Sequence, residues 1–167
     1  KCIGAEWLLC QRVCNNKAIF YPGEGSVQVQ HNKCNNCLKC SMICPAKAIT
    51  TYGEYKTAKE IVDDVEKDMI FYQNSKGGMT LSGGEPFAQS EFAMEILKTA
   101  KKRKIHTAVE TCGYYPEWEQ VKNIFAYVDY ILYDLKSMNT LKHKAYTGVD
   151  NDIILKNLQA LREEYPM

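Results

Sequence analysis

The sequence predicts an α/β fold of alternating strands and helices, preceded by a small cysteine-rich module. Seven of the eight cysteines lie in the first 44 residues. The rest of the chain alternates short apolar runs with amphipathic stretches at helical spacing. Such alternation is typical of parallel sheets whose strands are joined by helices. We therefore expect an iron–sulfur module over residues 1–52 and an α/β domain over residues 53–167.

Composition sets the limits for function. With 167 residues and 46% hydrophobic residues, the chain can bury a core. The 21 basic and 20 acidic residues are mixed and leave a net charge of +1, which does not indicate a nucleic-acid or membrane-surface partner. We see no apolar run of membrane-spanning length and no signal peptide. The chain begins at Lys1 rather than Met, so we expect a fragment of a longer protein.

The second group of cysteines has the spacing of a bacterial ferredoxin, Cys-x2-Cys-x2-Cys-x3-Cys-Pro, over residues 34–45. In that arrangement the first three thiolates bind one iron–sulfur cluster and the fourth binds another. One alternative is a set of disulfides, but gaps of two or three residues between cysteines give poor geometry for disulfides. The other alternative is a structural zinc site. Clustered free thiols also favour a reducing compartment, so we expect a cytoplasmic protein.

The first group of cysteines is irregular, Cys-x7-Cys-x3-Cys over residues 2–14. If partners are exchanged between the two halves, one [4Fe–4S] cluster is bound by Cys14, Cys34, Cys37 and Cys40. The second site then has three thiolates, those of Cys2, Cys10 and Cys44. This spacing resembles that of seven-iron ferredoxins, so we expect a [3Fe–4S] cluster, or a [4Fe–4S] cluster with a non-cysteine ligand such as Glu6. The alternative is a damaged site that binds nothing.

The cysteine module reads as an internal duplication, because Lys-Ala-Ile recurs at residues 17–19 and 47–49. Residues 27–30 alternate with period two, which predicts a short strand between the halves. A module of this size has little core, so bound clusters would contribute much of its stability.

Strand and helix signals then follow one another along the chain. Thr57 and Glu60 form a capping-box pattern, and apolar residues at 61, 62, 65, 69 and 70 predict a helix after it. We expect strands at residues 79–82, 105–109 and 130–133. Further helices are expected at residues 90–103, 116–127 and 152–164.

The most informative stretch is Gly-Gly-Met-Thr-Leu-Ser-Gly-Gly-Glu-Pro at residues 77–86. Adjacent glycines after a strand let the backbone approach a ligand closely, and Gly83 and Gly84 occupy that position. Glu85 then offers a carboxylate at the mouth of the turn. The alternative is an ordinary strand-to-helix turn with an exposed Glu.

Polar residues follow each of the three predicted strands, namely Glu85, then Glu110 and Thr111, then Asp134 and Lys136. In parallel α/β sheets, ligands bind at the carboxyl ends of the strands. Each residue also has a simpler interpretation: the acids as helix caps, and the lysine as a surface residue.

Two further residues are interpreted structurally. Cys112 is expected to be a small buried apolar residue, and His143 is expected to be solvated between two lysines.

These motifs resemble those of the glycyl-radical-enzyme activating enzymes, a branch of the radical S-adenosylmethionine (SAM) superfamily. The resemblance rests on residues 77–86, 110–114, 133–136 and 143–149. It implies a partial (β/α) barrel with an inserted ferredoxin-like module, open on the side where a large partner enzyme docks.

The resemblance also implies roles for individual residues. Gly83, Gly84 and Glu85 would hold the amino group of SAM, and Lys136 would meet its carboxylate. A cation site next to SAM would be lined by Thr111, Asp134, the carbonyl of Leu132 and Glu110. Glu110 stands where the family more often has Asp, and Cys112 stands where Ser or Asn is common.

The implied activity is reductive cleavage of SAM to a 5′-deoxyadenosyl radical, which abstracts hydrogen from a glycine of a partner enzyme. We expect a flavodoxin- or ferredoxin-type electron donor, clusters of the module that relay electrons inward, and a monomer. The Cys-x3-Cys-x2-Cys run that binds the catalytic [4Fe–4S] cluster in this superfamily is absent from residues 1–167 and is expected upstream. By itself the fragment should therefore be inactive.

Two other functions are considered. The first is a ferredoxin-like electron carrier fused to a non-catalytic domain that binds SAM or a nucleotide. The second is a radical SAM enzyme with another substrate.

Overall fold

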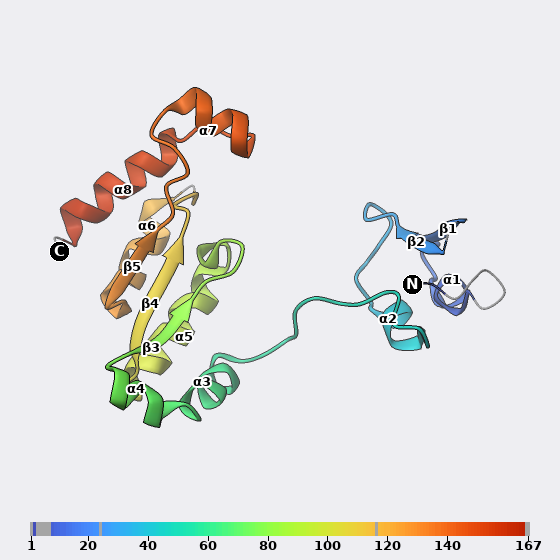
Figure 1. The fold of residues 1–167 in the computed structure, drawn as a ribbon, viewed down its shortest axis with the longest axis horizontal. Coiled ribbons are helices and arrows are strands. Elements are labelled where there is room, and N and C mark those ends of the chain that lie inside the picture. Colours follow the sequence, from blue (N-terminus) through green and yellow to red (C-terminus); the bar gives the residue numbers. More distant parts are fainter. Residues whose placement is uncertain (1, 3–7, 24, 116, 166–167) are drawn as a thin grey trace. The chain divides into compact units, whose positions relative to one another are not determined.

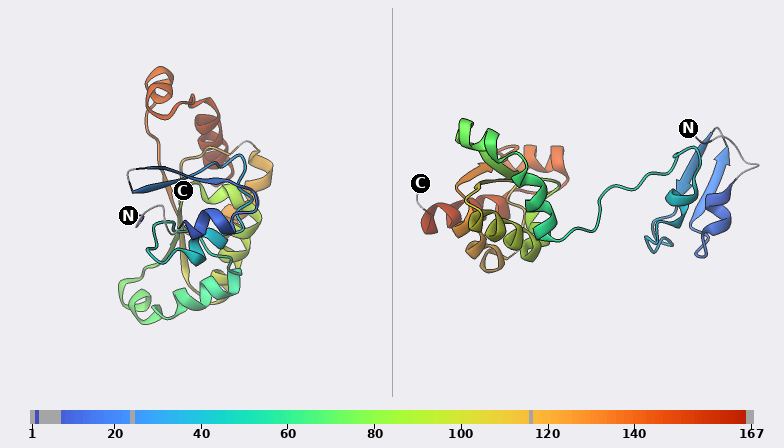
Figure 2. Two further views of the ribbon diagram at one scale, coloured as in Figure 1. Left: turned by 90° about the vertical axis from the view of Figure 1, so that its right-hand side faces the viewer. Right: turned by 90° about the horizontal axis from the view of Figure 1, so that it is seen from below.

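The computed structural model describes residue 2 and residues 8–23, 25–115 and 117–165. The chain divides into two compact units, Lys1–Tyr55 and Lys56–Met167, which are described separately. The predicted boundary between residues 52 and 53 falls near this division. Figures 1 and 2 show the secondary structure of each unit.

Over its described residues, the first unit has two short helices and a two-stranded sheet. Its elements in chain order are α1 (Leu9–Val13), β1 (Ile19–Gly23), β2 (Ser26–Val29) and α2 (Lys39–Ile43). The strands pair antiparallel, with Ile19 opposite Val29. The strand predicted at residues 27–30 is thus present as β2, one residue earlier.

The backbone of the first unit repeats as the duplicated Lys-Ala-Ile sequence predicts. Cys14 follows α1 and Cys44 follows α2 at the C-cap position. Three residues later, Lys17 and Lys47 adopt left-handed φ values of 48° and 47°. Their N–H groups donate to the carbonyls of Cys14 and Cys44 at 3.0 and 3.1 Å. The chain therefore makes the same turn after each helix.

The second unit is built on a three-stranded parallel sheet in the order β3–β4–β5. Its strands are β3 (Gly78–Leu81), β4 (His106–Thr111) and β5 (Tyr130–Tyr133). Its helices are α3 (Ala58–Glu66), α4 (Met69–Ser75), α5 (Ser90–Lys102), α6 (Trp118–Val121), α7 (Thr140–Thr147) and α8 (Asp152–Glu164), with 3₁₀ turns η2 (Pro86–Gln89) and η3 (Lys122–Tyr127). The predicted α/β class and parallel strand direction are confirmed.

Alternate residues of the sheet face the helices. Met79, Thr107 and Val109 are buried, whereas Thr80 and Tyr130 lie on the opposite, exposed side. In the register, Thr80 is opposite Ala108 and Ala108 is opposite Tyr130, so these positions share the exposed face. Helices therefore cover one face of the sheet, and the other is open within the described residues.

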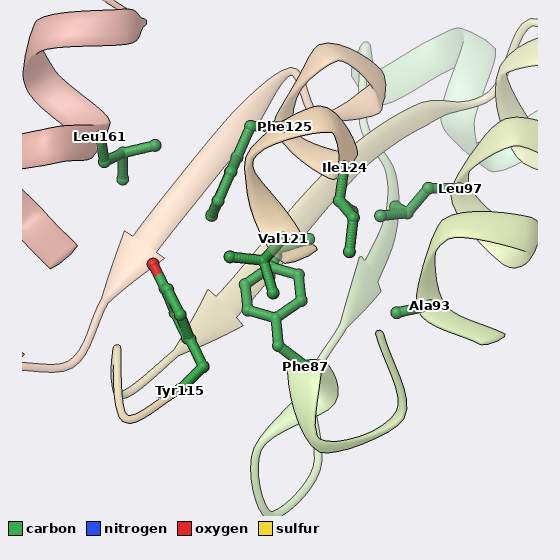
Figure 3. Packing of buried hydrophobic residues seen from close by; sticks show 9 residues of the cluster. Phe87, Ala93, Leu97, Tyr115, Val121, Ile124, Phe125 and Leu161 are labelled. Atoms are coloured by element: carbon green, nitrogen blue, oxygen red, sulfur yellow. The ribbon is translucent and has the colours of Figure 1, made fainter. Parts of the chain in front are cut away.

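Apolar side chains form two clusters against the covered face. The larger is centred on Phe87, whose ring meets Tyr115 and Phe125 edge-on at 5.4 and 5.2 Å between centroids. Figure 3 shows Phe87 between Tyr115 on one side and Ala93 and Leu97 on the other. Because Phe87 follows Glu85 by two residues, the core fixes the exit of the glycine turn.

The helix predicted after Thr57 is correct at its start but not along its whole apolar stripe. Thr57 and Glu60 form the capping box, with the Thr57 N–H donating to Glu60 Oε2 at 2.8 Å. The helix ends at Glu66, and α4 begins at Met69. This break shifts the helical phase, so Ile70 is 64% exposed rather than packed.

Two other segments differ from the sequence prediction. The helix expected over residues 116–127 is a single turn of α6 followed by the 3₁₀ turn η3, and residue 116 lies outside the described residues.

The sequence analysis predicts no helix at α7, which lies beyond the carboxyl ends of the strands (Figures 1 and 2). His143 on α7 is 2% exposed, so the expected solvated position is wrong. Its Nδ1 lies 2.9 Å from the carbonyl oxygen of Val149, which follows the end of α7. The spacing of residues in the sequence does not reveal this contact.

No helix among the described residues has both the length and the apolar character needed to cross a membrane.

A carboxylate fixes the amino-terminal end of the sheet. Asp129 Oδ2 accepts from the backbone N–H of Thr107 at 2.8 Å and from its hydroxyl at 3.1 Å. Lys101 Nζ lies 2.6 Å from Asp129 Oδ1. Burial raises the pKa of Asp129, but the hydrogen bonds from Lys101 and Thr107 outweigh burial and lower the net pKa.

We predict that Asp129→Ala lowers the free energy of unfolding by about 1–3 kcal/mol, because the buried N–H of Thr107 loses its acceptor. Urea unfolding at neutral pH, followed by circular dichroism, measures the change. Asp68→Ala is the matched control, since Asp68 is exposed and makes no side-chain cap on α4. Equal stability of the two variants would contradict the assigned role of Asp129.

Candidate cofactor-binding sites

The cysteines of the first unit line two separate cavities. One cavity is lined by three of them, Cys2, Cys10 and Cys44. The other is lined by four, Cys14, Cys34, Cys37 and Cys40. These are the two sets that the sequence pattern predicts. Glu6, the suggested extra ligand, lies outside the described residues.

The surroundings of the sulfur atoms also repeat between the two halves. The N–H of Ala18 donates to Cys14 Sγ at 3.2 Å, and the N–H of Ala48 donates to Cys44 Sγ at 3.2 Å. Hydrogen bonds to the sulfur atoms are among the features by which a protein tunes a bound iron–sulfur cluster.

The pKa values of the thiols follow burial and backbone contacts. Burial raises the pKa of Cys44, but backbone N–H groups of residues 46–49 outweigh burial and lower the net pKa. Burial raises the pKa of Cys10, and the neighbouring Cys44 and Cys2 raise it further. Burial likewise raises the pKa of Cys40.

The donor set fits iron–sulfur clusters. Each thiolate of a cluster binds its own iron, so cluster ligands are more widely spaced than the ligands of one ion. Within the described residues, no three His, Cys, Asp or Glu side chains are grouped closely enough to hold a single metal ion.

In the second unit, Glu85 lies at the carboxyl ends of β3 and β4. Its oxygens accept from the Thr111 hydroxyl at 2.8 and 2.9 Å. They also accept from the N–H of Cys112 at 2.9 Å, from its Sγ at 3.0 Å, and from the N–H of Phe87 at 3.2 Å. Four donor groups therefore surround one carboxylate, which ties the turn after β3 to the end of β4.

This arrangement explains the environment of Cys112. The thiol is partly buried, and burial raises its pKa, with a further rise from its hydrogen bond to Glu85. The interpretation of Cys112 as an inert apolar residue is therefore incomplete, because the thiol is one of the donors that hold Glu85.

The glycine turn before Glu85 needs a glycine at one position. Gly83 has φ +140°, in the region that side chains rarely adopt, and a Cβ there would meet no atom within 4 Å. The turn is therefore constrained by backbone conformation rather than by crowding, and it leaves the backbone of Gly83 and Gly84 exposed.

The end of β5 adds a charged pair to the same edge. The Lys136 ammonium contacts the Asp134 carboxylate, and this hydrogen bond raises the pKa of Lys136. The N–H of Asp134 donates to the Thr111 carbonyl at 2.9 Å, which joins the ends of β4 and β5. Glu110 is exposed and lies beside Leu132 in the register.

The structure therefore brings the predicted residues of the second unit to one edge of the sheet. Glu85 and Thr111 are in direct contact, and Asp134 and Lys136 form a second contacting pair. Among the described residues, no side-chain hydrogen bond joins Glu110 to either pair, but its charge contributes to the raised pKa of Lys136.

Several residues that support this edge were not identified from the sequence. Gly113 has φ +74°, and a Cβ there would lie 1.8 Å from the Tyr133 hydroxyl. Asn157 on α8 donates to the carbonyls of Gly113 and Tyr115 at 2.9 and 2.8 Å. The sequence signal for Asn157 is that a polar residue stands at an inward-facing position of the amphipathic helix α8.

Comparison with known proteins places the chain in a family. The family model of the radical SAM superfamily matches residues 31–166. The chain is 43% identical over 163 residues to an isethionate sulfite-lyase activating enzyme from Nitratidesulfovibrio vulgaris, covering 97% of this chain and 53% of that protein. It is 41% identical over 157 residues to a (2S)-3-sulfopropanediol sulfolyase activating enzyme from Bilophila wadsworthia, covering 94% of this chain and 51% of that protein.

The chain thus spans about half the length of the curated relatives it matches. A solved structure of a domain of pyruvate-formate lyase-activating enzyme from Bacteroides vulgatus is 36% identical, with a TM-score of 0.49 over 53% of this chain and 54% of that chain. Because the family model covers most of its residues, the chain belongs to the radical SAM superfamily, as its Gly-Gly-Glu turn and polar strand ends predict.

Proposed function

We propose that this chain is part of an activating enzyme that introduces a radical into a glycyl radical enzyme. The catalytic [4Fe–4S] cluster, whose Cys-x3-Cys-x2-Cys run is expected upstream of Lys1, would supply the electron for reductive cleavage of SAM to methionine and a 5′-deoxyadenosyl radical, and this radical would take a hydrogen atom from the partner's glycine. The similarity to activating enzymes supports this activity. The strongest structural support is Glu85, held by four donor groups beside an exposed glycine turn.

Residues of the second unit would bind the amino-acid end of SAM. Gly83, Gly84 and Glu85 would hold its ammonium group, and Lys136 would meet its carboxylate. The contacts of Lys136 with Asp134 support this role, because they hold an ammonium at the same edge as Glu85. Thr111, Asp134, Glu110 and the carbonyl of Leu132 would line the adjacent cation site.

The first unit would be a ferredoxin-like insert with two clusters. The four-cysteine cavity fits a [4Fe–4S] cluster, and the three-cysteine cavity fits a [3Fe–4S] cluster or a [4Fe–4S] cluster with another ligand. These clusters would relay electrons from a flavodoxin- or ferredoxin-type donor. Closely spaced free thiols support a reducing, cytoplasmic location, and we propose that the enzyme acts as a monomer.

The first test of the activity is to sequence the coding region upstream of Lys1. We expect a Cys-x3-Cys-x2-Cys run within ~20–40 residues, the length that a first strand and its loop require. An in-frame start codon directly before Lys1, with no such run, would contradict the enzyme assignment. That result would favour an electron carrier fused to a non-catalytic SAM- or nucleotide-binding domain.

The cluster assignment predicts the iron content of the full-length protein after anaerobic reconstitution. Cys40→Ser should remove about four irons and Cys44→Ser about three or four, because each change breaks one ligand set. Iron analysis with electron paramagnetic resonance measures both losses. Cys112→Ser is the matched control and should retain all iron. If Cys44→Ser also retained all iron, the second cluster would be ruled out.

The binding assignment predicts that Lys136→Gln weakens SAM affinity about tenfold or more, because an ion-assisted hydrogen bond to the SAM carboxylate is lost. Equilibrium dialysis with the reconstituted full-length protein measures the affinity. Lys144→Gln, which changes an exposed lysine of α7, is the control and should bind SAM normally. Equal affinities of the two variants would remove Lys136 from the site.

A further inference from the structure

Helix α8 contacts both loops that carry the proposed SAM-binding residues. Two of its asparagines are buried, with Asn157 3% exposed and Asn151, at the N-cap position, fully buried. Each directs its side-chain amide at backbone carbonyls of a loop that leaves the sheet. Neither residue belongs to the site described above, and a buried amide requires a specific partner.

Asn157 fixes the loop after β4. Its Nδ2 donates to the carbonyl of Gly113 at 2.9 Å and to that of Tyr115 at 2.8 Å. Both amide hydrogens are therefore used within one loop. The preceding residues, Thr111 and Cys112, are the ones that donate to Glu85. Asn157 thus holds the segment on which the position of the Glu85 carboxylate depends.

Asn151 fixes the loop after β5 in the same way. Its Nδ2 donates to the carbonyls of Ser137 and Met138 at 2.8 and 3.2 Å, directly after Lys136. An Asn at this position normally accepts from the first turn of the helix, but Asn151 makes no side-chain cap. Its Oδ1 is buried and has no hydrogen-bond partner among the residues that the structure describes. The Asn151 side chain therefore binds the loop after β5 and does not cap the first turn of α8.

A third contact lies between the two asparagines on α8. The hydroxyl of Tyr133 donates to the carbonyl of Ile154 at 2.7 Å. The same hydroxyl lies against Gly113, where a Cβ would come within 1.8 Å. One face of α8 therefore contacts the loop after β4, the end of β5 and the loop after β5.

We propose that Asn157 and Asn151 are positioning residues that set the separation between the two charged ends of the SAM site. Asn157 acts on Glu85 through Thr111 and Cys112, and Asn151 acts on Lys136 through the adjoining carbonyls. Neither touches SAM. This inference rests on the proposed function, because it takes Glu85 and Lys136 as the residues that bind the amino-acid part of SAM.

A purely structural role would affect every ligand of the protein equally. A positioning role predicts a selective effect, because both loops act on the amino-acid part of SAM rather than on its adenosine. 5′-Methylthioadenosine is a suitable probe, since it retains the adenosine and the sulfur but lacks the amino-acid part. The comparison of SAM with this probe separates the two roles.

The test uses the reconstituted full-length protein and two isosteric variants, Asn157→Asp and Asn151→Asp. Each variant removes two N–H donors and sets a carboxylate against carbonyl oxygens. We expect each to weaken SAM affinity about tenfold or more, with the affinity for 5′-methylthioadenosine changed less than about twofold. Equal losses for the two ligands, or no loss for either, would overturn the inference.

Hydrogen exchange supplies a readout that requires no ligand. Asn157→Asp should accelerate amide exchange at residues 112–115 and leave residues 137–139 unchanged, and Asn151→Asp should do the reverse. Each variant is thus the control for the other, since both change a buried Asn of the same helix. Acceleration of both loops by either variant would indicate general loosening and would contradict the inference.

If neither variant folds, the wild-type protein still provides a test, because coupling between two sites is reciprocal. Saturating SAM should then slow exchange in residues 112–115 and also in residues 152–158 of α8. Slower exchange in the loop alone would overturn the inference. Failure of the wild-type protein to bind SAM would instead contradict the proposed function.

Discussion

The carboxylate of Glu85 is the contact on which the arrangement of the second unit's site depends. It joins the turn after β3 to the end of β4 through Thr111 and Cys112, and Phe87 secures the same turn in the core. The hydroxyl of Thr111, the N–H and thiol of Cys112 and the N–H of Phe87 are all directed at it. Loss of this anion would leave several donors without an acceptor, which is more costly than loss of one hydrogen bond.

The first unit follows a different principle, in which one local backbone pattern is used twice. Lys17 and Lys47 make equivalent left-handed turns, and the amides of Ala18 and Ala48 then reach the preceding sulfur. The two cavities nevertheless differ in their number of cysteines. The duplication therefore supplies the shared geometry, whereas the irregular first half determines how many thiolates each site receives.

Local signals in the sequence were sufficient for much of the fold. The bounds of β5 and α8 agree with the prediction, because both are strongly patterned segments with clear flanking turns. Helix α7 has only a weak apolar stripe, so periodicity does not predict it, and the lysines that flank His143 predict exposure although its side chain is buried.

For the site, local motifs identified the polar strand ends but not their supports. Asn157 contacts residues more than 40 positions away in the chain, so its role depends on tertiary packing that periodicity does not encode. The same holds for Gly113, whose requirement for a glycine arises from its φ of +74° and from the side chain of Tyr133 on β5. The ligand roles of the predicted residues remain predictions.

The open sheet has a consequence for handling the protein. Within the described residues, β3 and β5 each pair on one side only, so both edges present unpaired backbone groups. Tyr130 and Leu132 on β5 are 67% and 52% exposed, which adds apolar surface beside one edge. Expressed alone, this stretch should self-associate through strand pairing. Oligomers seen with it would then reflect aggregation rather than the assembly state of the full-length protein.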